Sequence, residues 1–345
     1  MIKLESYFSY ADEINSNEFR IATNLKPEFR KNKKWITSDL AMMNPSTTRE
    51  VLLSILDKNS REQLVEDGIA VGTLFLRSRL VEYVISQSTS GLIAYFSWSR
   101  SGLRIEDFSL PPAVFEILKK VSGMSIITGP RGSGKSSLIK VLAENISESG
   151  LRVAIFSDCP EFFNKLGLSY VQVYKSKGLL HHANFISKGY DLIMIDSLDA
   201  KIWSQGVSLG GLGSRVMLVL PFSNSEIAVR RLSELISGNE SVGRSQVVDV
   251  LQLILGVRLV EGVRESHQMA FEVIYMTKEL KSLMQNSNWE QVEKFIGSQS
   301  EELGMLSLNQ SLLNLMLKRK IDLKVGFSES PHPEELDRMF EKIGL

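Results

Sequence analysis

Apolar and polar residues alternate along the first hundred positions in short runs, which polar or basic turns separate. A period of two is typical of a strand that is buried on one face, and a period near 3.6 is typical of an amphipathic helix. The mixture of both predicts a small α+β domain over residues 1–103. Its expected elements are a strand at 19–22, a helix at 47–56 with Ser46 or Thr47 as N-cap, and strands at 83–85 and 92–98.

Two prolines interrupt the pattern within residues 104–112 and indicate a linker there. From residue 113 onward strand-like runs alternate with helical segments. This order predicts a mostly parallel sheet covered by helices, an α/β domain over residues 113–345. After Arg264 the pattern is mainly helical, and we expect a helical C-terminal part from about residue 276. The expected elements are strands at 124–128, 153–156, 191–195 and 216–220, and helices at 136–146, 226–236 and 333–343.

Composition narrows the range of functions. With 43% hydrophobic residues, a chain of 345 residues can bury a sizeable core. Lys plus Arg equal Asp plus Glu, 40 against 40, so no basic surplus attracts nucleic acid and we expect no such partner. Cys159 is the only cysteine, which excludes an intrachain disulfide and fits a reducing, cytoplasmic location. Because no apolar run could span a bilayer, we expect no direct membrane insertion and a membrane contact only through a partner.

Residues 129–136 carry the most specific motif of the chain. They read Gly-Pro-Arg-Gly-Ser-Gly-Lys-Ser and fit the phosphate-loop pattern G-x-x-x-x-G-K-[ST], between an apolar strand and a helix. Glycines let backbone N–H groups turn toward phosphate oxygens, and the helix N-terminus adds partial positive charge. Lys135 would reach the β- and γ-phosphates of ATP, while the Ser136 hydroxyl would bind Mg²⁺. A glycine-rich turn would match by chance only on the order of 1% of the time. The expected nucleotide-binding residues here are Gly129, Pro130, Arg131, Gly132, Ser133, Gly134, Lys135, Ser136 and Ser137.

The C-terminal stretch 296–321 begins with a polar turn. The sequence Leu303-Gly304-Met305 follows, and then a predicted helix that carries Ser311, Leu312 and Leu315. This stretch resembles the tail of the type IV pilus retraction ATPases, a branch of the type II/IV secretion ATPase superfamily. Segments 24–51, 104–110 and 333–340 are similar to the entry segment, linker and last helix of that family, in the same order. The tetracysteine zinc module of the pilus-extension branch is missing, so the retraction branch is the closer one.

The resemblance implies a PAS-like N-terminal domain over residues 1–103 and a RecA-like ATPase domain over residues 113–345. It also implies ATP and Mg²⁺ as ligands and a homohexameric ring. In the family, hydrolysis moves the domains, and the ring acts on an inner-membrane platform protein to drive pilus retraction and twitching motility.

Three positions depart from the family's pattern, and each follows a predicted strand. The segment 157–161 reads S-D-C-P-E where the family usually has E-D-P-I-E, so Ser157 replaces a water-polarising glutamate. Ser197 replaces a second glutamate directly after Asp196, and Pro221 replaces a histidine. The remaining carboxylates, Asp158, Glu161 and Asp196, are the expected catalytic residues.

Asp196 follows four apolar residues, as does the aspartate that holds Mg²⁺ through water in ordinary phosphate-loop proteins, so we expect Ser136 and Asp196 to hold the metal. The alternative is that Asp196 merely caps the following helix.

Arg231 matches an arginine of the family and suits a γ-phosphate sensor, or else it forms a surface salt bridge. His181 and His182 point about 100° apart on a helix and are expected to be a solvated pair. Arg77 and Arg79 lie near the place of the family's nucleotide-facing arginines.

Two hypotheses follow. The chain is a motor subunit that hydrolyses ATP slowly, or it is a hydrolysis-deficient nucleotide-binding regulator that assembles with an active paralogous ATPase in a mixed ring. Loss of one general base typically costs 10²–10⁴-fold in rate, so the replacements predict weak turnover with binding intact. A shift of one residue in the comparison would instead give Asp158 or Asp196 the catalytic role. A signalling NTPase of another phosphate-loop family is the third, less favoured reading.

Overall fold

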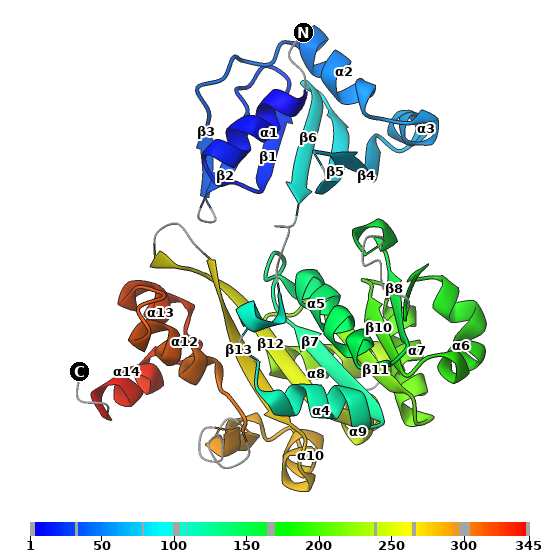
Figure 1. The fold of residues 1–345 in the computed structure, drawn as a ribbon, viewed down its shortest axis with the longest axis vertical. Coiled ribbons are helices and arrows are strands. Elements are labelled where there is room, and N and C mark those ends of the chain that lie inside the picture. Colours follow the sequence, from blue (N-terminus) through cyan, green and yellow to red (C-terminus); the bar gives the residue numbers. More distant parts are fainter. Residues whose placement is uncertain are drawn as a thin grey trace. The chain divides into compact units, whose positions relative to one another are not determined.

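The computed structural model describes residues 4–31, 34–77, 79–98, 104–108, 110–163, 170–237, 240–263, 267–292, 294–296 and 304–342. The chain divides into two compact units, Met1–Leu103 and Arg104–Leu345, and each unit has its own sheet (Figure 1).

The first unit is a six-stranded antiparallel sheet with the strand order β3-β2-β1-β6-β5-β4. Its core is aromatic: Phe19 stacks on Phe96 with ring centroids 4.7 Å apart, and Phe8 of the first helix meets Phe19 edge-on at 4.9 Å. The elements are α1 (Leu4–Glu13), β1 (Glu18–Ala22), β2 (Glu28–Lys31), β3 (Lys34–Thr37), α2 (Pro45–Ser54), α3 (Lys58–Glu66), β4 (Ile69–Leu76), β5 (Arg79–Ser88) and β6 (Gly91–Trp98).

The predicted strands of this unit are present, but the predicted helix cap is wrong. Asn44 caps α2, and its side chain accepts a hydrogen bond of 2.8 Å from the backbone N–H of Thr47. Pro45 then occupies the first helical turn, where a missing N–H costs nothing. The helix therefore begins earlier than the apolar spacing indicated.

The second unit is a seven-stranded sheet with the order β13-β12-β7-β11-β10-β8-β9, in which only β12 and β13 pair antiparallel. Helices lie on both faces of the sheet (Figure 1), and each face buries its own apolar cluster. The strands are β7 (Gly123–Thr128), β8 (Val153–Ser157), β9 (Val171–Lys175), β10 (Leu192–Asp196), β11 (Arg215–Leu220), β12 (Leu251–Glu261) and β13 (His267–Tyr275). The helices are η1 (Ile105–Phe108), α4 (Pro112–Lys120), α5 (Lys135–Glu148), η2 (Pro160–Phe162), α6 (Gly178–Gly189), α7 (Ala200–Gly211), α8 (Ser225–Ser237), α9 (Glu240–Val250), α10 (Lys278–Gln285), α12 (Leu308–Leu317), α13 (Leu323–Glu329) and α14 (Pro333–Lys342).

Two expectations for this unit are wrong. The mainly helical pattern after Arg264 is interrupted by β13, which pairs with β12 over nine residue pairs and extends the sheet; helices follow only from Lys278. The prolines expected to interrupt regular structure instead begin α4, with Pro111 as N-cap and Pro112 in the first turn.

Several residues that carry the C-terminal resemblance pack in the core, whereas Gly304 is exposed and Leu303 lies outside the described residues. Met305 is buried in the core against the sheet, and Leu312 is buried beneath the last helices. The Ser311 hydroxyl accepts a hydrogen bond of 3.0 Å from the backbone N–H of Phe271. The tail helix α12 is thus fastened to β13.

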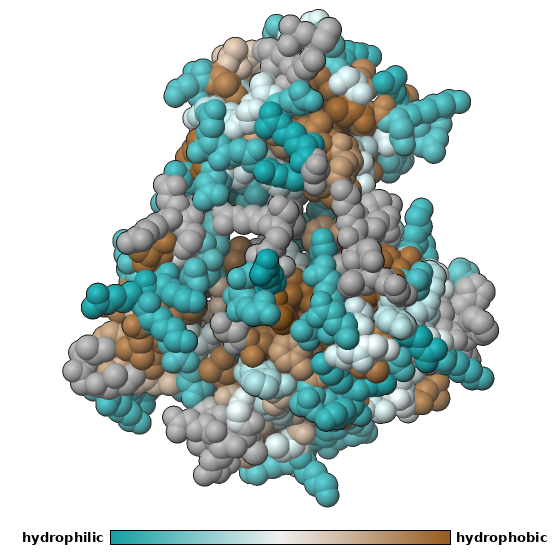
Figure 2. Space-filling view, viewed as in Figure 1, coloured by the Kyte–Doolittle hydropathy of each residue, from teal (hydrophilic) through white to brown (hydrophobic). Residues whose placement is uncertain are grey.

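The face seen in Figure 2 is mostly polar, with scattered apolar side chains. Among the described residues, no helix has both the length and the apolar character needed to cross a membrane.

Candidate functional site

The loop 129–134 connects β7 to α5 and is held close to a neighbouring strand. Gly134 is the N-cap of α5 and has a φ of 87°, which side chains rarely adopt. A Cβ on Gly129 would lie 2.3 Å from the carbonyl oxygen of Val257 on β12, so only glycine fits there. The backbone of this loop is therefore shaped by the absence of side chains, as the motif predicted.

Lys135 extends back over its own loop. Its Nζ donates hydrogen bonds of 2.8 Å to the carbonyl oxygens of both Gly129 and Pro130. Burial lowers the pKa of Lys135 to about 8, although the nearby Asp196 carboxylate opposes this shift. A partly desolvated ammonium group in a loop of backbone N–H groups is suited to bind an anionic ligand such as a phosphate.

Asp196, at the carboxyl end of β10, faces the start of α5. Burial raises the pKa of Asp196, while a hydrogen bond from the Ser136 hydroxyl and the charge of Lys135 act in the opposite direction. Ser136 and Asp196 thus present two hard oxygen ligands side by side, and such oxygens suit Mg²⁺. Within the described residues no group of three or more His, Cys, Asp and Glu could hold a metal, so this pair would rely on water or nucleotide oxygens for the other ligands.

The alternative role for Asp196, as a helix cap, is wrong. Asp199 is the N-cap of α7, and its side chain accepts a hydrogen bond of 2.9 Å from the backbone N–H of Lys201.

Asp158, after β8, is bound to the loops that follow β9 and β10. Its Oδ1 accepts hydrogen bonds from the hydroxyls of Ser176, at 2.5 Å, and Ser197, at 2.8 Å. Its Oδ2 accepts a hydrogen bond of 2.8 Å from the backbone N–H of Leu198. A carboxylate with both oxygens engaged in this way is poorly placed to take a proton from water.

Ser157 and Ser197, the two serines predicted to stand in place of glutamates, are both buried and both hydrogen-bonded. The Ser157 hydroxyl accepts a bond of 3.0 Å from the backbone N–H of Cys159, and Ser197 donates to Asp158. The side chain of Glu161 lies outside the described residues.

After β11, the loop with Pro221 is fixed through its backbone. Thr128, the last residue before the phosphate loop, donates a hydrogen bond of 2.9 Å to the carbonyl of Phe222. The Phe222 ring meets Trp203 with centroids 5.9 Å apart, and the Trp203 indole N–H donates a bond of 2.7 Å to the carbonyl of Ser197. Trp203 gives no sign of this role in the sequence, since its apolar helical spacing is ordinary for a core residue.

The remaining predicted residues lie on the surface. Arg231 forms a salt bridge of 2.9 Å with Glu234 on α8, with about half of the Arg231 side chain exposed. His181 is exposed, and the side chain of His182 lies outside the described residues. In the first unit, Arg79 and Arg77 both face Asp12, at 2.5 Å and 3.6 Å. Roles of Arg231 and of the two N-terminal arginines in nucleotide binding stay predictions.

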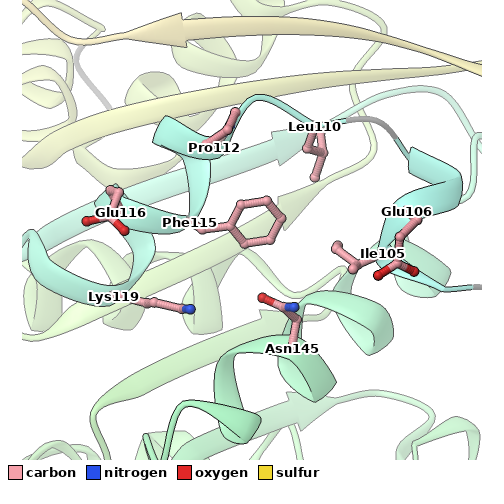
Figure 3. Close-up of a pocket in the computed structure, with 8 residues that line it drawn as sticks. All are labelled: Ile105, Glu106, Leu110, Pro112, Phe115, Glu116, Lys119 and Asn145. Carbon is pink, nitrogen blue, oxygen red and sulfur yellow. The ribbon is translucent and has the colours of Figure 1, made fainter.

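A cavity of about 410 Å³ lies between η1, α4 and α5 (Figure 3). Phe115 projects into it from α4, and Asn145 faces it from α5 (Figure 3). Its described lining residues include none from the phosphate loop, so it is separate from the site above.

No family model matches the chain. The chain is 23% identical over 286 residues to the uncharacterized protein YggR of Escherichia coli, which is 79% of this chain and 86% of that protein. It is 30% identical over 142 residues to the type IV pilus assembly ATPase PilB of Thermus thermophilus, which is 38% of this chain and 16% of that protein. It is 22% identical over 223 residues to a twitching motility protein of Neisseria gonorrhoeae, 62% of this chain and 59% of that protein. The last two matches span less than two thirds of the relative's length.

Solved structures share the fold over nearly the whole chain. The pilus retraction motor PilT with bound ADP matches with a TM-score of 0.77 and 18% identity, over 98% of this chain and 100% of that one. The ATPase DotB of Legionella pneumophila matches with a TM-score of 0.74 and 17% identity, over 94% of each chain. The likeness confirms the predicted fold class, an α/β protein with an N-terminal domain, a phosphate-loop domain and a helical C-terminal portion.

Proposed function

We propose that the chain is a member of the type IV pilus and secretion ATPase family, a proposal that its sequence relatives and its fold support. It binds Mg-ATP at residues 129–137 and hydrolyses it slowly, as a subunit of a ring that drives pilus retraction or a related surface-filament movement. The observation that carries the proposal is the phosphate loop with Lys135 above it and the Ser136–Asp196 pair beside it.

Each residue of the site has a defined part in this proposal. Backbone N–H groups of the loop and the N-terminus of α5 bind the phosphates, and Lys135 leaves the carbonyls of Gly129 and Pro130 to neutralise the β- and γ-phosphates. Ser136 and Asp196 hold Mg²⁺, which would offset the phosphate charge.

Slow hydrolysis is proposed because the groups that would activate water are replaced or engaged. Ser157 and Ser197 have no carboxylate, Pro221 has no imidazole, and Asp158 accepts three hydrogen bonds. The same observations favour a second candidate function, a hydrolysis-deficient regulator that assembles with an active paralogous ATPase.

For assembly, we propose a homohexamer or a mixed ring with that paralogue, located in the cytoplasm and attached to the inner membrane through a pilus platform protein. The support is the fold shared with a pilus retraction motor that was solved with bound ADP. Sedimentation of the full chain with and without nucleotide tests the ring, and a monomer under both conditions would refute it.

Steady-state phosphate release by the pure full chain with Mg-ATP tests the catalytic part, and titration with a fluorescent ATP analogue tests binding. We expect slow release, and micromolar binding that Lys135→Ala weakens about 10- to 100-fold, because hydrogen bonds to charged groups contribute about 1.5–3 kcal/mol. If neither the wild type nor Lys135→Ala releases phosphate, while the wild type still binds the ATP analogue, the hydrolysis-deficient regulator is favoured. Equal affinity in both proteins would remove the site assignment.

A further inference from the structure

Asp158 joins the ends of three adjacent strands, β9, β8 and β10, which lie in this order in the sheet. It belongs to the loop after β8, accepts from Ser176 in the loop after β9, and accepts from Ser197 and Leu198 in the loop after β10. Both serine donors are buried, at 5% and 2% exposure, and each O–H group finds its acceptor in this carboxylate.

The loop after β10 is the one that begins with Asp196, the proposed Mg²⁺ ligand. Ser197 follows Asp196 directly, and the backbone N–H of Asp158 also donates a 3.1 Å hydrogen bond to the carbonyl of Asp196. The direction of the Asp196 side chain is therefore set on one side by Ser136 and on the other by the bonds that hold the next two residues to Asp158.

We propose that Asp158 is a positioning residue of the Mg²⁺ site: it fixes the loop after β10 so that Asp196 stays directed at Ser136. The inference rests on the proposed function. Trp203 supports the same loop from the other side, by its bond to the carbonyl of Ser197. The carboxylate acts through Asp196 and does not itself touch the metal or the attacking water. Partners that orient metal ligands typically contribute 10- to 100-fold in metal affinity.

The test measures the affinity of the full chain for a fluorescent ATP analogue over a Mg²⁺ titration and in EDTA. Asp158→Ala removes all three hydrogen bonds that the carboxylate accepts. We expect it to raise, about 10-fold, the Mg²⁺ concentration at which the Mg²⁺-dependent gain in affinity for the ATP analogue is half complete. Affinity in EDTA should change less than about 2-fold, because the phosphate loop is untouched. Ser197→Ala removes one of the contacts to Asp158, together with the bond of 3.2 Å that the hydroxyl accepts from the backbone N–H of Asp199. It should raise the same concentration by a smaller factor, and it decides the question if Asp158→Ala fails to fold.

Asp191 provides a matched control. It joins β8 and β10 at their opposite ends, where its carboxylate accepts a hydrogen bond of 2.8 Å from the backbone N–H of Arg152. We expect Asp191→Ala to leave the Mg²⁺ dependence unchanged even if the protein melts at a lower temperature. A melting curve for each variant separates the two effects.

Each other outcome has a distinct meaning. Wild-type Mg²⁺ dependence in both Asp158→Ala and Ser197→Ala would overturn the positioning role. Loss of phosphate release in Asp158→Ala with wild-type Mg²⁺ dependence would also overturn it, and would make Asp158 the general base. If Asp158→Ala loses as much nucleotide affinity in EDTA as with Mg²⁺, Asp158 only stabilises the fold, and the positioning role is overturned. A wild-type chain that binds no nucleotide would instead refute the proposed function.

Discussion

The phosphate loop and the loops after β8, β10 and β11 lie at the same edge of one sheet, but they are built in different ways. The phosphate loop matches its motif at every required position. Its geometry depends on missing side chains, at Gly129 against Val257 and at Gly134 with its positive φ. The other loops carry Ser157, Ser197 and Pro221, the predicted departures from the resembled family, and they are joined to each other through Asp158 and Trp203.

The difference teaches that the two parts of the site are maintained by different means. Backbone geometry makes the phosphate cradle, and at Gly129 a single added Cβ would meet the Val257 carbonyl oxygen at 2.3 Å. Side chains would make the water-activating part, and hydroxyl groups can replace them while the loops stay ordered. In such a site, nucleotide binding and turnover can be changed separately.

The largest effect is expected from a single methyl group in the phosphate loop. Gly129→Ala should abolish nucleotide binding, because the new Cβ would lie 2.3 Å from the Val257 carbonyl oxygen and the loop must move. Gly150→Ala is the control: its φ of 81° costs an alanine about 1 kcal/mol, a backbone strain that Gly129→Ala does not bring, but nothing lies within 4 Å of the new Cβ. Titration of both variants with a fluorescent ATP analogue is the measurement, and wild-type affinity in Gly129→Ala would contradict the close approach.

Next in size is the effect of placing acids at the two buried serines, Ser157 and Ser197. The double variant Ser157→Glu, Ser197→Glu should lower the free energy of unfolding by about 3 kcal/mol, because it introduces two carboxylates at positions that are 2% exposed. We expect no gain in phosphate release, since Ser197→Glu also places a carboxylate against Asp158. Urea unfolding and phosphate release check both statements. Ser208→Glu, on the exposed side of α7, is the control and should be nearly neutral.

A smaller, graded effect concerns pH. Because burial lowers the pKa of Lys135 to about 8, the nucleotide-free protein loses this proton above pH 8. Phosphate favours the protonated lysine, so binding should take up a proton, and affinity should fall about tenfold per pH unit above 8. The stability of the nucleotide-free protein has the opposite pH dependence. Between pH 8 and 10.5 the Lys135 amino group is protonated in the unfolded chain and neutral in the folded one, so the contribution of Lys135 to the free energy of unfolding rises over this range.

Nucleotide titrations at pH 7, 8, 9 and 9.5 measure this dependence, together with calorimetry in buffers of different protonation enthalpy. Lys135→Arg stays protonated throughout, so any affinity that it retains should be flat over the same range. A flat profile in the wild type would mean that Lys135 keeps its ordinary pKa.

The smallest effect is expected at Arg231. If its bond to Glu234 is only an exposed salt bridge, Arg231→Ala should cost about 0.5 kcal/mol or less of unfolding free energy and leave Mg-ATP binding unchanged. A clear loss of ATP affinity without a loss of ADP affinity would instead support the predicted γ-phosphate sensor.

The sequence predicted those parts of the fold whose signal is local. The strands β7, β8, β10 and β11 are almost fully buried and parallel, and such strands read as continuous apolar runs. The phosphate loop was predictable for a similar reason, because its conformation is encoded in neighbouring glycines. By contrast, β13 mixes buried and half-buried residues and gave no clear period.

The connections between loops could not be predicted in this way. Asp158, Ser176 and Ser197 are up to 39 residues apart, and they meet only because β8 lies between β9 and β10. Strand order of this kind depends on long-range packing, which no local pattern of residue types carries. Asn44 differs from these: the Asn-Pro pair before α2 was a local signal for the cap that the apolar spacing concealed.

The loop after β8 contains the only cysteine of the chain, directly after Asp158 and half-buried. A thiol-directed dye or spin label would therefore attach at a single, known position without any engineered change to the sequence. Its reaction rate would rise as this loop opens, since a half-buried thiol is only partly accessible while the loop is closed. Cys159 thus makes the movement of the three joined loops observable in the wild-type protein, with and without nucleotide.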